Sequence, residues 1–489
     1  MSTATGVPAE AGAHRGRAGW SGRLAGRIAA LPPRAVAVLG VLAWIAALAA
    51  VEPLVRGYLT NAPDQRMVDL DVYRTGGLSV LRGQPLYTML TQPPQLLAFT
   101  YPPVAALFAV PLALISWPAA QLAWVAFIYV PLAVVLAFAF APLLHRAGRM
   151  RAVALAALFA GCAYLFPMRD EVRFGQVDMV LLALALADCA ARAPRWPRGA
   201  LVGLATAIKL VPGIFIVYLW LAGRRRAALT ALAAAAAWTL GAWLLVPQDS
   251  KTYWTSAVFS PGRLGSNSGT SDQSLRGMLL RAFLPGQAPG AVWVAVAAVV
   301  AVAGFAVVRR LVLQGREMEG IAVTGLLGVL LSPVSWIHYF VVVVVVLGAI
   351  LADGRSAGRV VIAAVTAAYF YLTIPWWGQS LLGAGGVPTL VARIVQDGFG
   401  IAALVLIAII ATLRRWHDVH YALRLPGTRG HLLSGGARRR RPRCRRAALP
   451  DHPGCARRGA RRSGGAGRGA HREFGRGSRH GDPGRPGHR

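Results

Sequence analysis

Lysine and acidic residues are scarce in this chain. Of its 489 residues only 15% are charged, 19 are Asp or Glu, and Lys209 and Lys251 are the two lysines beside 50 arginines. Apolar residues make up 56% of the chain. Apolar runs recur from residue 34 to residue 413, and many are close to the roughly 20 residues that span a bilayer. The composition excludes a soluble globular protein and predicts an all-α integral membrane protein with about 10–12 membrane helices.

Cysteine is also rare, and its placement excludes two classes of site. Cys162 and Cys189 lie in apolar runs, whereas Cys444 and Cys455 lie in a basic segment near the end of the chain. These spacings match neither a disulfide framework, nor a zinc site, nor a redox pair.

The last part of the chain supplies +14 of the net charge of +33. From Ser434 onward there are 17 arginines and only three acidic residues, Asp451, Glu473 and Asp482. This Arg/Gly/Pro-rich segment has no apolar periodicity, which predicts disorder. It could bind anionic lipid head groups or RNA, or it could be an extension without function or a frame error. We expect no specific nucleic-acid partner.

Three regions follow from these patterns. Residues 1–33 form a basic leader without the cleavage pattern of a signal peptide, which predicts a cytoplasmic segment before a retained first helix. Residues 34–416 form the membrane domain. Residues 417–489 form the basic tail.

Arginine clusters orient the membrane helices, because short cytoplasmic loops collect Lys and Arg. Placing every arginine cluster on the cytoplasmic side requires an even number of membrane crossings between neighbouring clusters. The apolar runs give an odd number of crossings in two intervals, unless the runs 99–116 and 199–222 are broken or re-entrant. Alternatively, one loop violates the rule. Both runs contain prolines, and irregular backbone at membrane depth persists where it lines a cavity. The external loops are then 53–98, 168–175, 247–289 and 376–396.

The first external loop carries two acids in the stretch MVDLDVYRTGG (67–77). Apolar residues at Val72, Leu78 and Leu81 predict a short interfacial helix with Asp69 near its start. A carboxylate at this position could simply cap the helix N-terminus. It could also serve chemistry at the membrane surface, as could Asp71.

Lys209 lies within the apolar run GLATAIKLVPG. An ammonium at membrane depth is costly unless it is paired or faces water, so such residues are candidates for function. Phosphate is one natural partner. The alternative is that the side chain extends to the lipid head groups.

Three further stretches place polar groups near the external side. NSGTSDQSLRG contains Gln273 and Arg276, which suit sugar hydroxyls or phosphate, although a solvated loop has a similar composition. LLSPVSWIHYF places His338 after a helix-breaking Ser-Pro, where it is either structural or able to contact a lipid phosphate. RFGQVDMVLL places Gln176 at the start of a helix.

Six strings in this chain, taken in order, resemble glycosyltransferase family 87, the membrane mannosyltransferases that include the polyprenyl-phosphate-mannose-dependent α-1,2-mannosyltransferases of actinobacteria. The strings are VDLDVY, FTYPPVAALFAVPL, FGQVDMVLLAL, GLATAIKLVP, DQSLRG and LLSPVSWIHY. They cover roughly residues 69–340.

The resemblance implies a GT-C-type fold in the plasma membrane with an extracytoplasmic active site. It assigns the catalytic acid to Asp69 and leaves Asp71 as second choice, since Asp71 fills a variable position of its string. Two departures stand out. The family often has a pair of histidines where this chain has His338 followed by Tyr339, and DQS replaces a common Asn-Gln-Ser.

The implied chemistry is sugar transfer from a polyprenyl-phosphate-sugar to a glycolipid or glycan acceptor. Asp69 would accept the proton of the acceptor hydroxyl as the anomeric centre inverts, and no divalent metal or other cofactor is required. The expected donor phosphate ligands are Lys209, Arg276 and His338. The expected substrate-binding residues are Tyr73, Gln176, Asp272 and Gln273.

Two alternatives remain open at this point. A related enzyme could transfer arabinofuranose or another pentose or hexose. A lipid-linked sugar flippase or transporter would also use a buried lysine and broken helices, but it explains the acidic external loop poorly.

Overall fold

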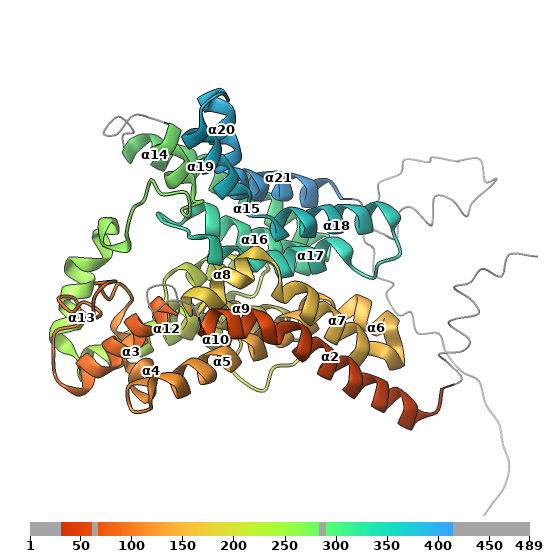
Figure 1. Ribbon diagram of the computed structural model, residues 1–489, viewed down its shortest axis with the longest axis horizontal. Coiled ribbons are helices and arrows are strands. Elements are labelled where there is room, and N and C mark those ends of the chain that lie inside the picture. The colour runs from red at the N-terminus through yellow and green to blue at the C-terminus, as the bar shows by residue number, and fades with distance from the viewer. Residues whose placement is uncertain (1–30, 61–66, 283–289, 414–489) are drawn as a thin grey trace, which may run out of the picture. The chain divides into compact units, whose positions relative to one another are not determined.

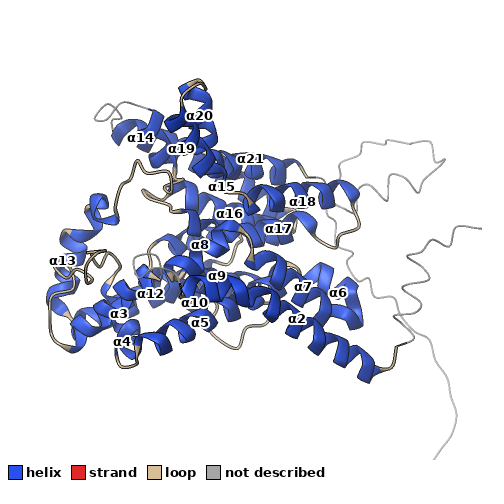
Figure 2. Cartoon of the chain, viewed as in Figure 1, coloured by secondary structure: helices blue, strands red, loops and turns tan. Residues whose placement is uncertain are grey.

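The computed structural model describes residues 31–60, 67–282 and 290–413, all of which belong to the unit Met1–Arg424. Most of the basic leader and the whole basic tail lie outside the described residues. The described part of the chain is built from helices and contains no strand (Figure 2).

Four helices are long and apolar enough to cross a membrane: α2 (Pro33–Leu59), α5 (Trp117–Ala139), α12 (Arg225–Leu245) and α15 (Gly290–Leu313). Three pairs form sharply bent segments, namely Ala141–Ala163 with Phe166–Phe174, Ala357–Tyr371 with Ile374–Ala384, and Thr389–Gln396 with Gly398–Thr412. Within the described residues, length and composition therefore support four spans, or up to seven if each bent pair is one span. The expected 10–12 would include shorter apolar helices as well. The all-α integral membrane class is confirmed.

The two segments expected to be broken are broken. Within 99–116 the helix α4 (Pro103–Ala113) has only 11 residues, because it cannot begin before the proline pair. Within 199–222 the helix α10 (Ala200–Ile208) ends at Lys209, whose backbone is extended. A short turn η3 (Val211–Gly213) follows and leads into α11 (Ile214–Leu221).

Short helices occupy the segments expected outside the membrane. They are α3 (Val68–Leu81), α13 (Pro247–Thr255), η4 (Ala257–Phe259), η5 (Pro261–Leu264), α14 (Leu275–Ala282), α19 (Ile374–Ala384) and α20 (Thr389–Gln396). Figure 1 shows α3, α4 and α13 gathered at one end of the helical body. The helix α3 confirms that a short helix forms around Val72, as expected. It packs closely on α4, because a Cβ at Gly77 would lie only 2.6 Å from the carbonyl oxygen of Ala109.

Buried apolar helices form the centre of the body. They are α9 (Asp178–Ala190), α16 (Glu317–Leu331) and α17 (Val343–Leu351), with the turn η6 (Ile337–Val342) between the last two. Around them lie α8 (Phe166–Phe174), α7 (Arg151–Ala163), α6 (Ala141–Ala147), the turn η2 (Gly148–Met150), α18 (Ala357–Tyr371) and α21 (Gly398–Thr412). Helix α8 packs against η6. This packing brings the acidic face of α8 next to His338.

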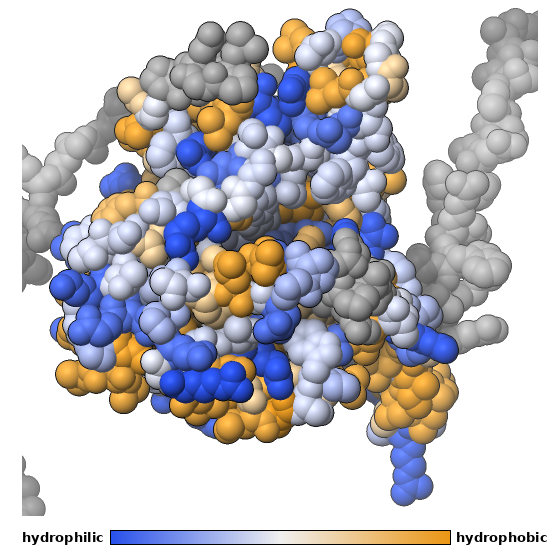
Figure 3. Space-filling model, turned by 60° about the vertical axis from the view of Figure 1, so that its left-hand side comes forward, coloured by the Kyte–Doolittle hydropathy of each residue, from blue (hydrophilic) through white to orange (hydrophobic). Residues whose placement is uncertain are grey.

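The surface has a hydrophobic part and a hydrophilic part. Figure 3 shows hydrophobic residues gathered along the lower rim of the view and hydrophilic residues around a central hollow. Exposed apolar side chains on α2, α5, α12 and α15 account for much of the hydrophobic surface. In a soluble protein such a surface would be unfavourable, whereas in a bilayer it faces lipid.

Candidate active site

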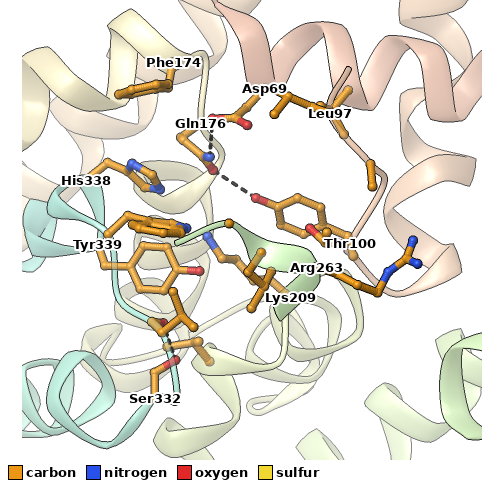
Figure 4. A pocket seen from close by; sticks show the side chains of 18 of the residues that line it. Asp69, Leu97, Thr100, Phe174, Gln176, Lys209, Arg263, Ser332, His338 and Tyr339 are labelled. Carbon is orange, nitrogen blue, oxygen red and sulfur yellow. Dashed lines mark hydrogen bonds between the residues drawn. The ribbon is translucent and has the colours of Figure 1, made fainter. Parts of the chain in front are cut away.

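A cavity of about 740 Å³ opens beside the break at Lys209. Its wall comes from the start of α3, the segment 95–102, the junction of α8 and α9, the turns η4 and η5, and the loop 332–339. Figure 4 shows Asp69, Gln176, Lys209, His338 and Tyr339 directed toward this space from different elements. Four of the residues expected at a site are therefore brought together: Asp69, Gln176, Lys209 and His338.

Asp69 lies in the first turn of α3, and its side chain is held by Gln176 rather than by the helix. The Gln176 amide Nε2 donates to Asp69 Oδ2 at 2.8 Å. The amide oxygen of Gln176 accepts hydrogen bonds from Tyr73 (2.9 Å) and Tyr101 (3.1 Å). The cap residue Met67 makes no side-chain cap hydrogen bond. The structure therefore gives Asp69 a fixed orientation toward the cavity, which helix capping alone does not explain.

Burial changes the acidity of Asp69. Loss of water around the carboxylate raises its pKa to about 6, against the opposing effects of the Gln176 hydrogen bond and the Lys209 charge. Neighbouring carboxylates, including Asp170, raise the pKa slightly further. A carboxylate with this pKa is a better proton acceptor than an ordinary aspartate, yet it remains mostly ionised near neutral pH.

Lys209 is buried and paired. Its Nζ donates to both carboxylate oxygens of Asp178, at 2.8 and 2.9 Å. The same ammonium lies 3.9 Å from the centre of the Tyr339 ring and 5.5 Å from that of Tyr101. Such a position is favourable for a cation. Because Lys209 is held inside the protein, the alternative that it extends to lipid head groups does not fit its geometry.

His338 lies between two carboxylates. Its Nδ1 is 3.6 Å from Asp170 Oδ2, and its Nε2 is 3.7 Å from Asp178 Oδ2. Neither distance is a good hydrogen bond, and no hydrogen-bond partner for either ring nitrogen lies among the described residues. The ring of Phe174, 6.0 Å away between centroids, packs beside it. His338 is therefore a buried side chain beside the cavity whose two ring nitrogens make no hydrogen bond within the described residues and could each bond to a ligand.

Five expected residues lie elsewhere. Asp71 is on α3 next to Arg74 and Thr75 and does not line the cavity. Tyr73 lies behind Gln176 and supports it, rather than lining the wall. The remaining three, Asp272, Gln273 and Arg276, are also absent from the wall.

Asp272 and Gln273 shape the cavity indirectly. Asp272 Oδ1 accepts from the backbone N–H of Ser335 (2.9 Å) and of Ser274 (3.0 Å). The backbone N–H of Gln273 donates to the Ser335 carbonyl at 2.7 Å. These bonds fix the loop that presents Trp336. Neither side chain lines the cavity. The Gln273 amide is fully hydrogen-bonded within the protein, whereas Asp272 Oδ2 is buried without a hydrogen-bond partner among the described residues. Their role in substrate binding stays a prediction.

Arg276 also departs from expectation. It lies on α14, and its Nη1 is buried without a hydrogen-bond partner among the described residues. It does not line the cavity, and its role as a donor phosphate ligand stays a prediction. The polar composition of its string gave no indication of which way the side chain points.

Several residues in or next to the wall were not assigned a role from the sequence. Asp170 and Asp178 face His338, Tyr101 supports Gln176, and Arg263 lies across the cavity from Lys209 (Figure 4). A signal existed for Asp178, because it falls two residues after Gln176 at the start of an apolar helix. Arg263 had none, since its loop reads as ordinary polar sequence.

Comparison with known proteins gives a matching family and several relatives. Residues 99–333 match the family described as glycosyltransferase family 87. A polyprenol-phosphate-mannose-dependent alpha-(1-2)-phosphatidylinositol mannoside mannosyltransferase of Mycobacterium tuberculosis is 35% identical over 318 residues, which are 62% of this chain and 74% of that relative. The protein of the same description from Mycolicibacterium smegmatis is 37% identical over 339 residues, or 64% of this chain and 76% of the relative.

A third relative has a different acceptor in its description. It is a phosphatidylinositol pentamannoside mannosyltransferase of Mycolicibacterium smegmatis, 33% identical over 280 residues, with 56% of this chain and 67% of the relative covered. No solved structure gave a significant match.

Proposed function

Since this chain belongs to glycosyltransferase family 87, we propose that it moves a mannosyl residue from a polyprenyl-phosphate-mannose donor to a phosphatidylinositol mannoside or related glycolipid on the extracytoplasmic side of the plasma membrane. Membership of a glycosyltransferase family excludes the flippase alternative. The relatives use a polyprenol-phosphate-mannose donor, and two of them act on phosphatidylinositol mannoside. These descriptions support the donor and the acceptor class.

One observation carries the mechanism. Asp69 and Lys209 face the same cavity from separate elements, with the Gln176 side chain bonded to Asp69 between them (Figure 4). A proton acceptor and a cation are the two groups that this transfer needs. The acceptor must lose a proton as it attacks, and the phosphate gains charge as it leaves.

The proposed reaction is a single displacement. The acceptor hydroxyl oxygen attacks the anomeric carbon of mannose, and its proton passes to the carboxylate of Asp69. The bond between the anomeric carbon and the phosphate oxygen breaks, and its electron pair stays on the phosphate. Attack opposite to the leaving group inverts the anomeric centre. The product is the mannosylated acceptor together with polyprenyl phosphate.

Lys209 and His338 form the proposed phosphate side of the cavity. Lys209 supplies a positive charge at a fixed position beside Tyr339. His338 supplies a ring whose nitrogens have no hydrogen-bond partner among the described residues. In a buried site these groups stabilise the charge that develops on the leaving phosphate more strongly than water-exposed groups would.

A transfer assay tests the proposal. Membranes containing the full chain are incubated with radiolabelled polyprenyl-phosphate-mannose and phosphatidylinositol mannoside, and labelled glycolipid is separated by thin-layer chromatography. We expect label in a larger mannoside only when both substrates are present. A well-expressed, membrane-inserted protein that transfers no label from this donor to any mannoside acceptor would contradict the proposal. Transfer from polyprenyl-phosphate-arabinose instead would correct only the sugar.

A further inference from the structure

The charges around Lys209 pose a problem for a cavity that must bind and then release a phosphate. The lysine is surrounded by carboxyl groups: Asp178 is bonded to it, and Asp69 and Glu171 lie within electrostatic range. Its positive charge is therefore already balanced within the protein. A phosphate that approaches Lys209 also meets the negative charge of Asp178 behind it.

Asp178 is placed to act on the phosphate through Lys209 and His338 rather than directly. It does not line the main cavity, whereas Lys209 and His338 do. Asp178 instead lines a second, small cavity of about 60 Å³, which is otherwise largely apolar. Its side chain is 13% exposed and that of Lys209 is 6% exposed. The carboxylate therefore lies beside the proposed phosphate ligands without lining the main cavity itself.

The geometry also shows that this carboxylate is held firmly. Asp178 is the first residue of α9, where the helix dipole favours a negative charge. Both of its oxygens accept from Lys209, and Oδ2 lies near His338 as well. The Lys209 ammonium has three N–H donors. Two of them are used by Asp178, and the Tyr339 side chain is also within hydrogen-bonding range of the ammonium.

We infer that Asp178 is a positioning residue that limits how tightly Lys209 holds phosphate, so that the polyprenyl phosphate product can leave. The inference rests on the proposed function, in which Lys209 binds the donor phosphate. The product phosphate carries more negative charge than the donor diester, so a buried lysine without an opposing charge nearby would hold the product more tightly than the substrate. Asp178 weakens this hold because its negative charge repels the phosphate and because it occupies two of the lysine N–H donors.

The test uses the purified full chain in lipid nanodiscs and a sugar-free probe, farnesyl phosphate. Removing the Asp178 charge with Asp178→Asn should tighten farnesyl phosphate binding by about tenfold or more, since unit charges a few ångströms apart interact strongly near a buried site. In mannosyl transfer the same variant should show a lower donor KM, a lower kcat and stronger inhibition by farnesyl phosphate. A purely structural role would lower activity and abundance without tightening phosphate binding.

Matched variants make the result specific. Asp178→Glu keeps the charge and should stay within about threefold of the native protein in binding, because the attraction between opposite charges survives the extra methylene. Asp397→Asn removes the acid of another buried ion pair, Arg281 Nε to Asp397 Oδ1 at 2.6 Å, which is outside the cavity. It should lower thermal stability and leave farnesyl phosphate binding unchanged. If Asp178→Asn does not fold, Asp178→Ser carries the same expectation.

The inference and the proposed function fail in different ways. Lys209→Met should abolish farnesyl phosphate binding, and the double variant with Asp178→Asn should stay far weaker than the native protein, because the repulsion is removed but the cation is still missing. If Lys209→Met binds the probe normally, the phosphate role of Lys209 is wrong, and the inference falls with it. If Lys209→Met loses binding but a folded Asp178→Asn binds the probe no tighter than the native protein, the proposed phosphate site stands and the inference alone is overturned.

Discussion

The assignment of Asp69 as general base can be tested by a substitution that changes almost nothing else. Asp69→Asn keeps the size of the side chain and an oxygen that can accept from Gln176 Nε2, as Asp69 Oδ2 does at 2.8 Å. It removes the proton acceptor. A positioned general base contributes about 10²–10⁴-fold to the rate, which corresponds to roughly 3–5 kcal/mol of barrier. Mannosyl transfer should fall by that factor while protein abundance stays unchanged.

The pH dependence of mannosyl transfer is a second test of the role of the Asp69 carboxylate. Burial raises the pKa of Asp69 to about 6. A base must be ionised to act, so kcat/KM should be level above pH 7 and should fall about tenfold per pH unit below about pH 6. In Asp69→Asn the residual activity should lose this acidic limb. An ordinary surface aspartate would instead place the fall near pH 4.

Asp71→Asn is the matched control for Asp69→Asn. Asp71→Asn changes a carboxylate on the same helix that does not line the cavity, so its transfer rate should stay close to normal. Initial rates with radiolabelled donor, measured at saturating acceptor and corrected for protein amount, compare the variants. Near-normal transfer by Asp69→Asn would refute the reasoning, because asparagine also serves as a helix cap and would satisfy a purely structural role. The search would then move to Asp170.

Three further outcomes are expected. A cysteine at Ser268, which is exposed, should react with a membrane-impermeant maleimide in intact cells, and one at Arg225 should not; the reverse pattern would invert the topology. Gly277→Ala should destabilise the protein by about 1–3 kcal/mol through overpacking, because a Cβ there would lie 2.7 Å from Asp272 Cγ, so its thermal unfolding midpoint should fall. Truncation after Leu433 should leave mannosyl transfer intact, and loss of membrane insertion would show that the basic tail is required.

The sequence predicted the parts of the site that depend on unusual residues in unusual places. A lysine in an apolar run and prolines inside long apolar runs each carry a large energetic cost, which makes them visible without a structure. Lys209 and the two broken segments were therefore predictable, whereas Asp69 was singled out by the family resemblance of its string. The partner of Lys209 was not, because Asp178 is 31 residues away along the chain and only tertiary packing brings the two together.

Three predicted site residues lie outside the cavity wall, and composition could not show this. Asp272 Oδ1 and the Gln273 amide satisfy backbone N–H and C=O groups that would otherwise be buried without partners. A polar loop residue can contact substrate or backbone, and composition does not distinguish these two uses. For Arg276, a motif fixes the residue type but not the direction of a long side chain.

The hydrogen bonds of Gln273 have a consequence for exchanging parts between family members. Its side-chain amide donates to the Gln396 carbonyl, and its oxygen accepts from the backbone N–H groups of Phe399 and Gly400. These partners lie beyond residue 333, where the family match ends. In a chimera that joined the first 340 residues of this chain to the C-terminal helices of a relative, Gln273 would therefore come from one parent and its hydrogen-bond partners from the other. The folding of the chimera would depend on whether the grafted helices offer the Gln273 side chain the same backbone groups.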